Sequence, residues 1–147
     1  MQVGASNRVM VRSLDFDPTT QEYAQFSVRM PKAWDEGTIS FQPYWTANTG
    51  NTGGVVWSLR GVCLANDDGF DAAWGSVSNS ALTYITTNDM HAGPSSGAIT
   101  IAGTPAANDM CMYEVSREVG NASDTLVADA KLIGVALFFT INAGDDT

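Results

Sequence analysis

The chain has 147 residues, of which 44% are hydrophobic, and a formal net charge of −9 with a pI near 4.2. This length suits a single domain with its own core, so we expect one domain over residues 1–147. Nucleic acids and anionic membranes bind proteins through clustered Lys and Arg residues, so the acidic charge argues against both partners. No apolar run is long enough for a signal peptide or a membrane span, and we expect neither.

Apolar and polar residues alternate with a period of two along most of the chain, which predicts β-strands. Segments rich in Gly, Pro, Asn and Asp separate the alternating runs, as turns require. One short helical turn is expected at 71–74, a short N-terminal arm at 1–7 and a frayed C-terminus at 143–147. We expect about eight strands, at residues 9–16, 22–30, 38–45, 55–63, 82–87, 98–102, 110–117 and 130–141.

Antiparallel strands of this number and length indicate an all-β fold, a two-sheet antiparallel sandwich of jelly-roll type. An immunoglobulin-like sandwich is the alternative, but its Cys–Trp–Cys spacing does not occur. The alternation also predicts which side chains face the core. Over 22–63 this inward set is Ala24, Phe26, Val28, Met30, Ile39, Phe41, Trp45, Val55, Trp57, Leu59 and Cys63.

The segment 130–141 differs from the other strands because both of its faces are apolar. A strand that is apolar on both faces is usually covered on both. The opposite sheet would cover one face, and either a loop or a second subunit would cover the other. If a second subunit does so, our candidate interface residues are Leu132, Ala136 and Phe138.

Residues that carry hydrolytic chemistry are few and scattered, so we expect no enzymatic activity. The single histidine, His91, lies in a loop-like stretch, and no Gly-x-Ser-x-Gly nucleophile motif occurs. Cys63 and Cys111 fall on inward positions, and we expect them to be buried, reduced thiols. Glu114 lies within a strand, and we expect a solvated outer-face residue that pairs with an Arg.

Metal and cofactor motifs are equally sparse, and we expect no cofactor. One His and two distant Cys residues cannot supply the three or four ligands of a zinc site, and no phosphate-binding loop is present. Asp67, Asp68 and Asp71 surround Gly69 and form a weak calcium candidate. Since no glutamate closes this loop, a turn with solvated aspartates is the simpler interpretation.

Four aromatic residues are candidate contacts for a ligand or a partner. Trp34 and Trp74 lie in expected loops, whereas Tyr23 and Tyr44 fall on the outward faces of strands that we expect to be neighbours. Exposed aromatic side chains of this kind stack on sugars or on partner proteins, and the alternative is an ordinary cross-strand pair.

Eight segments of the chain are distinctive as a set. They are VMVRSLDFD (9–17), TTQEYAQF (19–26), MPKAWDEGT (30–38), YWT (44–46), GVVW (54–57), SGAITIAGTP (96–105), DTL (124–126) and DAKLIGV (129–135). Together they resemble a family of tailed-bacteriophage and prophage virion proteins, and the resemblance runs over nearly the whole chain. It implies a jelly-roll domain displayed on a virion as a capsid decoration protein, a head fibre or a tail-fibre knob, commonly as a trimer.

From this resemblance we expect a capsid decoration protein that trimerises on the head surface and binds the major capsid protein. Its location would be the virion, assembled in the cytoplasm of the bacterial host. The alternative is a receptor- or glycan-binding knob of a head or tail fibre, with Tyr23, Trp34, Tyr44 and Trp74 as its contacts.

Overall fold

The protein is described by a computed structural model that covers residues 2–3, 9–48 and 52–142. No helix long and apolar enough to cross a membrane lies within these ranges. Of the expected arm at 1–7, only Gln2 and Val3 are described, and the expected frayed end at 143–147 lies outside the described residues. The strands in the described ranges are β1 (Gln2–Val3), β2 (Val9–Met10), β3 (Leu14–Phe16), β4 (Tyr23–Arg29), β5 (Trp34–Thr46), β6 (Gly54–Leu64), β7 (Ser78–Thr83), β8 (His91–Ala92), β9 (Met110–Arg117) and β10 (Ala130–Ile141).

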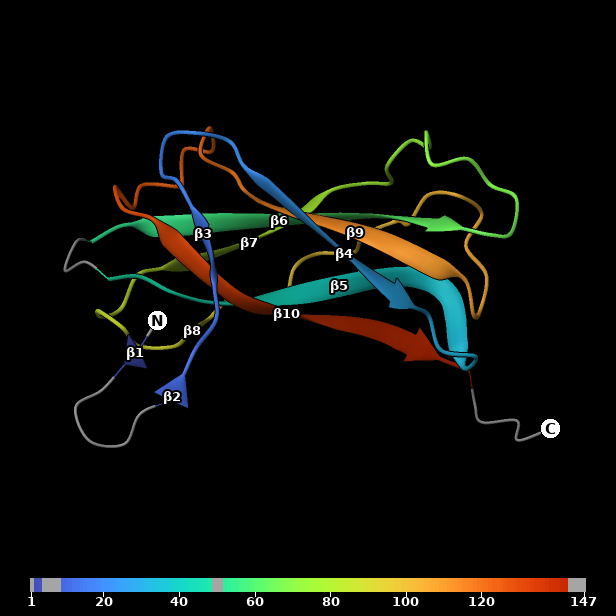
Figure 1. Ribbon diagram of the computed structural model, residues 1–147, viewed down its shortest axis with the longest axis horizontal. Coiled ribbons are helices and arrows are strands. Elements are labelled where there is room, and N and C mark those ends of the chain that lie inside the picture. Colours follow the sequence, from blue (N-terminus) through green and yellow to red (C-terminus); the bar gives the residue numbers. More distant parts are fainter. Residues whose placement is uncertain (1, 4–8, 49–51, 143–147) are drawn as a thin grey trace.

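Strands β3 to β10 form two four-stranded antiparallel sheets, which lie in two layers in Figure 1. The strand orders are β3-β10-β5-β8 in the first sheet and β4-β9-β6-β7 in the second. This interleaving of early and late strands is the order of a jelly roll. The predicted two-sheet antiparallel sandwich is therefore confirmed. Strands β1 and β2 form a separate two-stranded sheet near the N-terminus.

The predicted strands at 110–117 and 130–141 are found with those bounds, whereas several other predicted boundaries are wrong. β5 begins four residues before the predicted 38, because Trp34 pairs with Ile141 of β10. β7 lies at Ser78–Thr83 instead of 82–87, and the predicted helical turn at 71–74 is absent. The predicted strand at 98–102 forms only two isolated bridges, one to each sheet. β8 was not predicted.

The predicted inward faces of β4, β5 and β6 are confirmed. Those of β5 and β6 lie in the core, and that of β4 packs against it with partly buried side chains. Trp45 and Trp57 are fully buried, and the ring of Phe16 meets Trp57 edge to face with centroids 5.1 Å apart. Buried aromatic side chains of this size remove large apolar areas from water and stabilise the sandwich.

A β-bulge in β10 changes the side-chain pattern that its sequence suggests. Leu132 lies opposite Trp45, but the next residue of β5, Tyr44, lies opposite Gly134, so Ile133 is an extra residue. One extra residue reverses the inward and outward phases of the strand. Leu132 is consequently 5% exposed and packs in the core, so the prediction that it lies on an interface face is wrong.

Cys63 and Cys111 form a buried disulfide between β6 and β9, which contradicts the expectation of two reduced thiols. The two residues lie directly opposite each other in the antiparallel register. The N–H of Cys63 donates to the carbonyl oxygen of Ala102 at 3.0 Å, away from β9. The cysteines therefore occupy a non-hydrogen-bonded pair, the position at which opposing side chains come closest.

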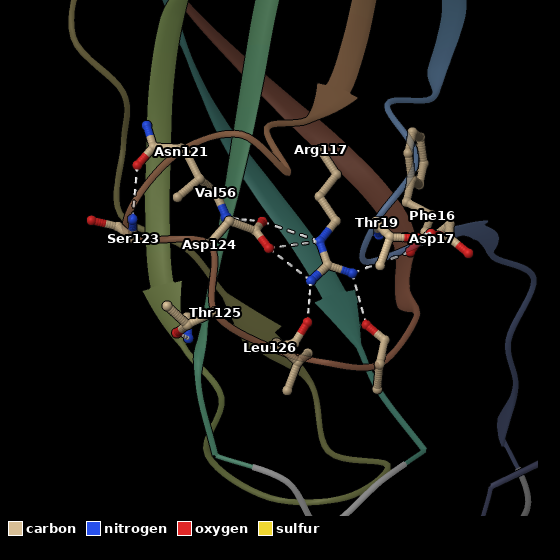
Figure 2. Close-up of polar contacts among 12 residues, drawn as sticks. Phe16, Asp17, Thr19, Val56, Arg117, Asn121, Ser123, Asp124, Thr125 and Leu126 are labelled. Carbon is tan, nitrogen blue, oxygen red and sulfur yellow. Dashed lines mark hydrogen bonds and ion pairs between the residues drawn. The ribbon is translucent and has the colours of Figure 1, made fainter.

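Arg117, at the end of β9, holds four segments together through a fully buried guanidinium group (Figure 2). Its Nε and Nη2 donate to the carboxylate of Asp124, at 2.8 to 3.1 Å. Nη2 also donates to the carbonyl oxygen of Leu126, and Nη1 donates to those of Ala128 and Phe16. All five N–H groups of the guanidinium thus have acceptors, which offsets the cost of burying its charge.

Asp124 is buried equally deeply and is held from two sides. The side chains of Arg117 and Asp124 are 0% and 1% exposed. A second hydrogen bond reaches the same carboxylate from β6, since the N–H of Val56 donates to its Oδ2 at 3.0 Å. The ion pair thereby joins β9, β6, the end of β3 and the loop that leads into β10.

We predict that Arg117→Met lowers the free energy of unfolding by about 3–5 kcal/mol, because it leaves the Asp124 carboxylate buried without its cation. Urea denaturation measures this change. The matched control is Arg29→Met, which removes an exposed cation of β4 that bonds to the Asn108 side chain and should cost about 1 kcal/mol or less. Equal losses in the two variants would contradict the structural role of Arg117.

Tyr113 is fully buried on β9, and its hydroxyl donates to Sδ of Met30 at 3.3 Å. Burial raises the pKa of Tyr113 from 10.0 to about 12. The folded state therefore holds the phenol proton at a pH where the unfolded chain has lost it. Stability from this group is fully present below pH 10 and is lost as the pH rises toward 12.

The raised pKa of Tyr113 implies that ionisation of this group costs the wild-type protein about 2–3 kcal/mol of stability between pH 10.0 and about pH 12. We predict that Tyr113→Phe lacks this part of the loss. Urea denaturation at a series of alkaline pH values measures the effect. Tyr23→Phe, at a 58% exposed tyrosine, is the matched control and should leave the alkaline profile unchanged. An unchanged profile in Tyr113→Phe would contradict the assignment.

Candidate functional site

The structure separates the four aromatic residues that the sequence suggested as contacts. Trp34 is 1% exposed in the core, so its predicted role as an exposed contact is wrong. Tyr23 lies on β4 and Tyr44 on β5, which belong to opposite sheets, so they do not form a pair. Trp74 is partly buried in the loop after β6, with the guanidinium carbon of Arg60 5.3 Å from its ring centroid. These four side chains do not form one binding platform.

His91 is fully buried, and both of its ring nitrogens are hydrogen-bonded. Its ring is stacked between Trp45 and Tyr84, with centroids 4.4 and 5.2 Å away. Nε2 accepts from the N–H of Ile85 at 2.9 Å, and this assigns the ring proton to Nδ1, which donates to the carbonyl oxygen of Asp89. A general base needs a nitrogen that can reach a substrate, and His91 has none.

The acidic candidates do not form a catalytic or metal-binding cluster. Asp67, Asp68 and Asp71 are exposed, and Asp68 accepts a hydrogen bond from the N–H of Ala65. In the described ranges no group of three His, Cys, Asp or Glu residues is placed to hold a metal ion. Glu114 pairs with Arg60 across the sheet as expected, but it is only 7% exposed instead of solvated.

The surface that does gather predicted residues is the outer face of the first sheet, which we call the β10 face. In register, Gly134 lies opposite Tyr44, Ala136 opposite Gln42, and Phe138 opposite Ser40. These six residues, which define the β10 face, carry no formal charge, although the chain as a whole has a net charge of −9. Two predicted interface residues, Ala136 and Phe138, therefore lie beside the predicted contact Tyr44.

Polar side chains on the β10 face are largely bonded to one another. The hydroxyl of Tyr44 donates to Oε1 of Gln42 at 3.0 Å, and Nε2 of Gln42 donates to the carbonyl oxygen of Gly93 at 2.8 Å. Phe138 is 47% exposed and borders a groove of about 390 Å³ with Ser40 and Ala98. Such a face resembles the core of a protein interface, which is depleted in charge and rich in aromatic side chains.

Within the part of the chain that the structure describes, no strand pairs with one edge of β10 over most of its length. β5 pairs with β10 from Lys131 to Ile141, but β3 pairs with the other edge only from Ala130 to Leu132. Beyond this point an apolar groove of about 370 Å³ opens between the sheets. The residues that line it include Leu14, Ala24, Phe26, Val115, Leu132, Ile133 and Val135.

Sequence reasoning missed this edge because it considered only the two faces of the strand. A signal was present, since residues 132–142 contain no charged residue and no proline. Charged residues and proline are the usual protection of an exposed strand edge. The arrangement can therefore bind another strand or an uncharged protein surface, and it offers no group that would attack or protonate a substrate.

We predict that His91→Phe lowers the free energy of unfolding by about 1–3 kcal/mol, because it preserves ring stacking but leaves the Ile85 N–H without a partner. Urea denaturation measures the loss. Asp89→Ala is the control, since only the backbone of Asp89 bonds to His91, and it should change stability by less than about 0.5 kcal/mol. A neutral His91→Phe variant would show that these hydrogen bonds do not matter.

Comparison of the chain with models of protein families, with curated proteins and with solved structures found no match to any of them. The chain is therefore characterised by its own geometry, a jelly-roll sandwich in which the β10 face is uncharged and no described strand pairs with the edge of β10 beyond Leu132.

Proposed function

We propose that this chain is a structural protein of a bacteriophage virion, most specifically a capsid decoration protein that stabilises the head. The observation that carries the proposal is the uncharged β10 face with its open edge, on a protein that is otherwise acidic. Such a surface favours association with protein, whereas the net charge of −9 disfavours nucleic acid.

Three further observations support this function. Eight-stranded jelly rolls are common in viral capsid proteins, although a fold alone does not fix a function. The segments from 9–17 to 129–135 resemble phage virion proteins, and that resemblance implies an oligomer, commonly a trimer. A decoration protein needs no catalytic group, because binding only to the assembled shell stabilises that shell by mass action.

The geometry does not favour the alternative of a glycan-binding knob. A sugar platform needs exposed aromatic side chains that lie together, but Trp34 is in the core and the two candidate tyrosines lie on opposite sheets. Phe70, which is 87% exposed, lies with Trp74 in the loop after β6, whereas the other three candidates lie on strands.

We predict that purified virions of the encoding phage contain this chain in a fixed, high ratio to the major capsid protein. The copy number should match the capsid lattice, because a decoration protein occupies every equivalent site. Quantitative mass spectrometry of gradient-purified virions measures the ratio, with a tail protein of known copy number as the internal control. A few copies for each virion would contradict decoration and favour a fibre, and complete absence would contradict a virion role.

A further inference from the structure

The backbone of β10 points a regular set of hydrogen-bonding groups away from the molecule. On β5, the carbonyl oxygens of Ile39, Phe41 and Pro43 are turned away from β10 and accept hydrogen bonds from other segments. Their donors are the N–H groups of Ile99, Ser96 and Gly93, at 2.7 to 2.9 Å. In an antiparallel pair, opposite residues either exchange both hydrogen bonds or exchange none. The β10 residues opposite these three therefore form no hydrogen bond with β5.

Those β10 residues are Val135, Leu137 and Phe139. Because β3 pairs only with 130–132, their N–H and C=O groups have no strand partner among the described residues. Beyond its pairing with β3, the ribbon of β10 runs along the border of its sheet in Figure 1. Unpaired edges of this length attract another strand unless charge or proline protects them, and neither occurs in 132–142.

We propose that this edge pairs with β10 of a second copy of the chain, antiparallel across a two-fold axis through Leu137. This register pairs Val135 with Phe139 of the second copy and Leu137 with Leu137 of the second copy. All three residues that point to the free edge are then in hydrogen-bonded positions. The two sheets would join into one sheet across the dimer.

The side chains on the β10 face fit this register. Ala136 of each copy lies opposite Phe138 of the second copy, in a non-hydrogen-bonded pair where side chains come closest. A small residue thus faces a large one, and the pair covers Phe138, which is 47% exposed in the single chain. A pairing of Phe138 with Phe138 would not give this complementarity.

The charges at the two ends of β10 also fit an antiparallel pair. Arg12 lines the groove at the Ile133 end of the strand. At the other end, Ile141 pairs with Trp34, which Asp35 and Glu36 follow. The two-fold axis brings Arg12 of each copy toward the end of the second copy's β10 where Asp35 and Glu36 lie on the adjacent strand β5. Between these ends the edge is uncharged, so two copies with a net charge of −9 each can approach there.

The contact rests on the association surface of the proposed function and names a second copy as its partner. It gives that surface a two-fold axis, in place of the trimer that the resemblance implies. Light scattering on the size-exclusion peak should give twice the chain mass of 15.6 kDa. Phe138→Glu should raise the dissociation constant about tenfold or more, as loss of a central interface side chain does. Phe70→Glu, at an 87% exposed position in a loop, is the control and should not change it.

Disulfide trapping tests the register itself. A mixture of the Ala136→Cys and Phe138→Cys variants should form a covalent dimer with one copy of each, whereas each variant alone should crosslink far less. The same pairing should protect the amides of Val135, Leu137 and Phe139 from hydrogen exchange, and the protection should increase with protein concentration. A monomer at all concentrations, a trimer, or a dimer that lacks the mixed crosslink would overturn the proposal.

Failure of this pairing is distinguishable from failure of the proposed function. The copy number in purified virions does not depend on the oligomeric state in solution. A monomeric chain present at the lattice number would refute the β10 pair and leave decoration intact. A dimeric chain that is absent from virions would refute decoration and leave the β10 pair intact.

Discussion

The buried cation of Arg117 organises the region of the sandwich where β3 meets β10. The guanidinium of Arg117 has no exposed surface, so every one of its N–H groups needs an acceptor within the fold. The carbonyl oxygens of Phe16 and Ala128 supply two of these, which fixes the end of β3 beside the start of β10. β3 and β10 consequently pair at 130–132, and the remaining edge of β10 stays open.

The bulge at Ile133 follows immediately after this pairing and divides β10 into two parts with different surroundings. Before it, Ala130 and Leu132 belong to the core. After it, Ala136 and Phe138 lie on the outer face, while the backbone groups of Leu137 point to the free edge. The same strand therefore closes the core at one end and exposes an uncharged outer face at the other. A bulge commonly redirects side chains in this way at the edge of a sheet.

The sequence was sufficient for the features that depend on local pattern and insufficient for those that depend on distant partners. Alternation predicted the fold class and the bounds of β9, and a segment apolar on both faces predicted the bounds of β10. It placed Trp34 in a loop, because the pairing of Trp34 with Ile141 joins residues far apart in the chain. Leu132 was assigned to the wrong face because a bulge leaves no mark in the alternation. Ala136 and Phe138 were correctly placed on the outer face of the sheet. The unpaired edge beside them could not be predicted, because it depends on where β3 ends.

The disulfide between Cys63 and Cys111 has a mechanical consequence when the chain is pulled from its two ends. It joins β6 to β9, two adjacent strands inside the second sheet. Tension applied between the two ends of the chain passes through this covalent bond and bypasses residues 64–110. The segment that contains β7 and β8 therefore cannot be extended by a pulling force, and only the strands outside the crosslink can be peeled away.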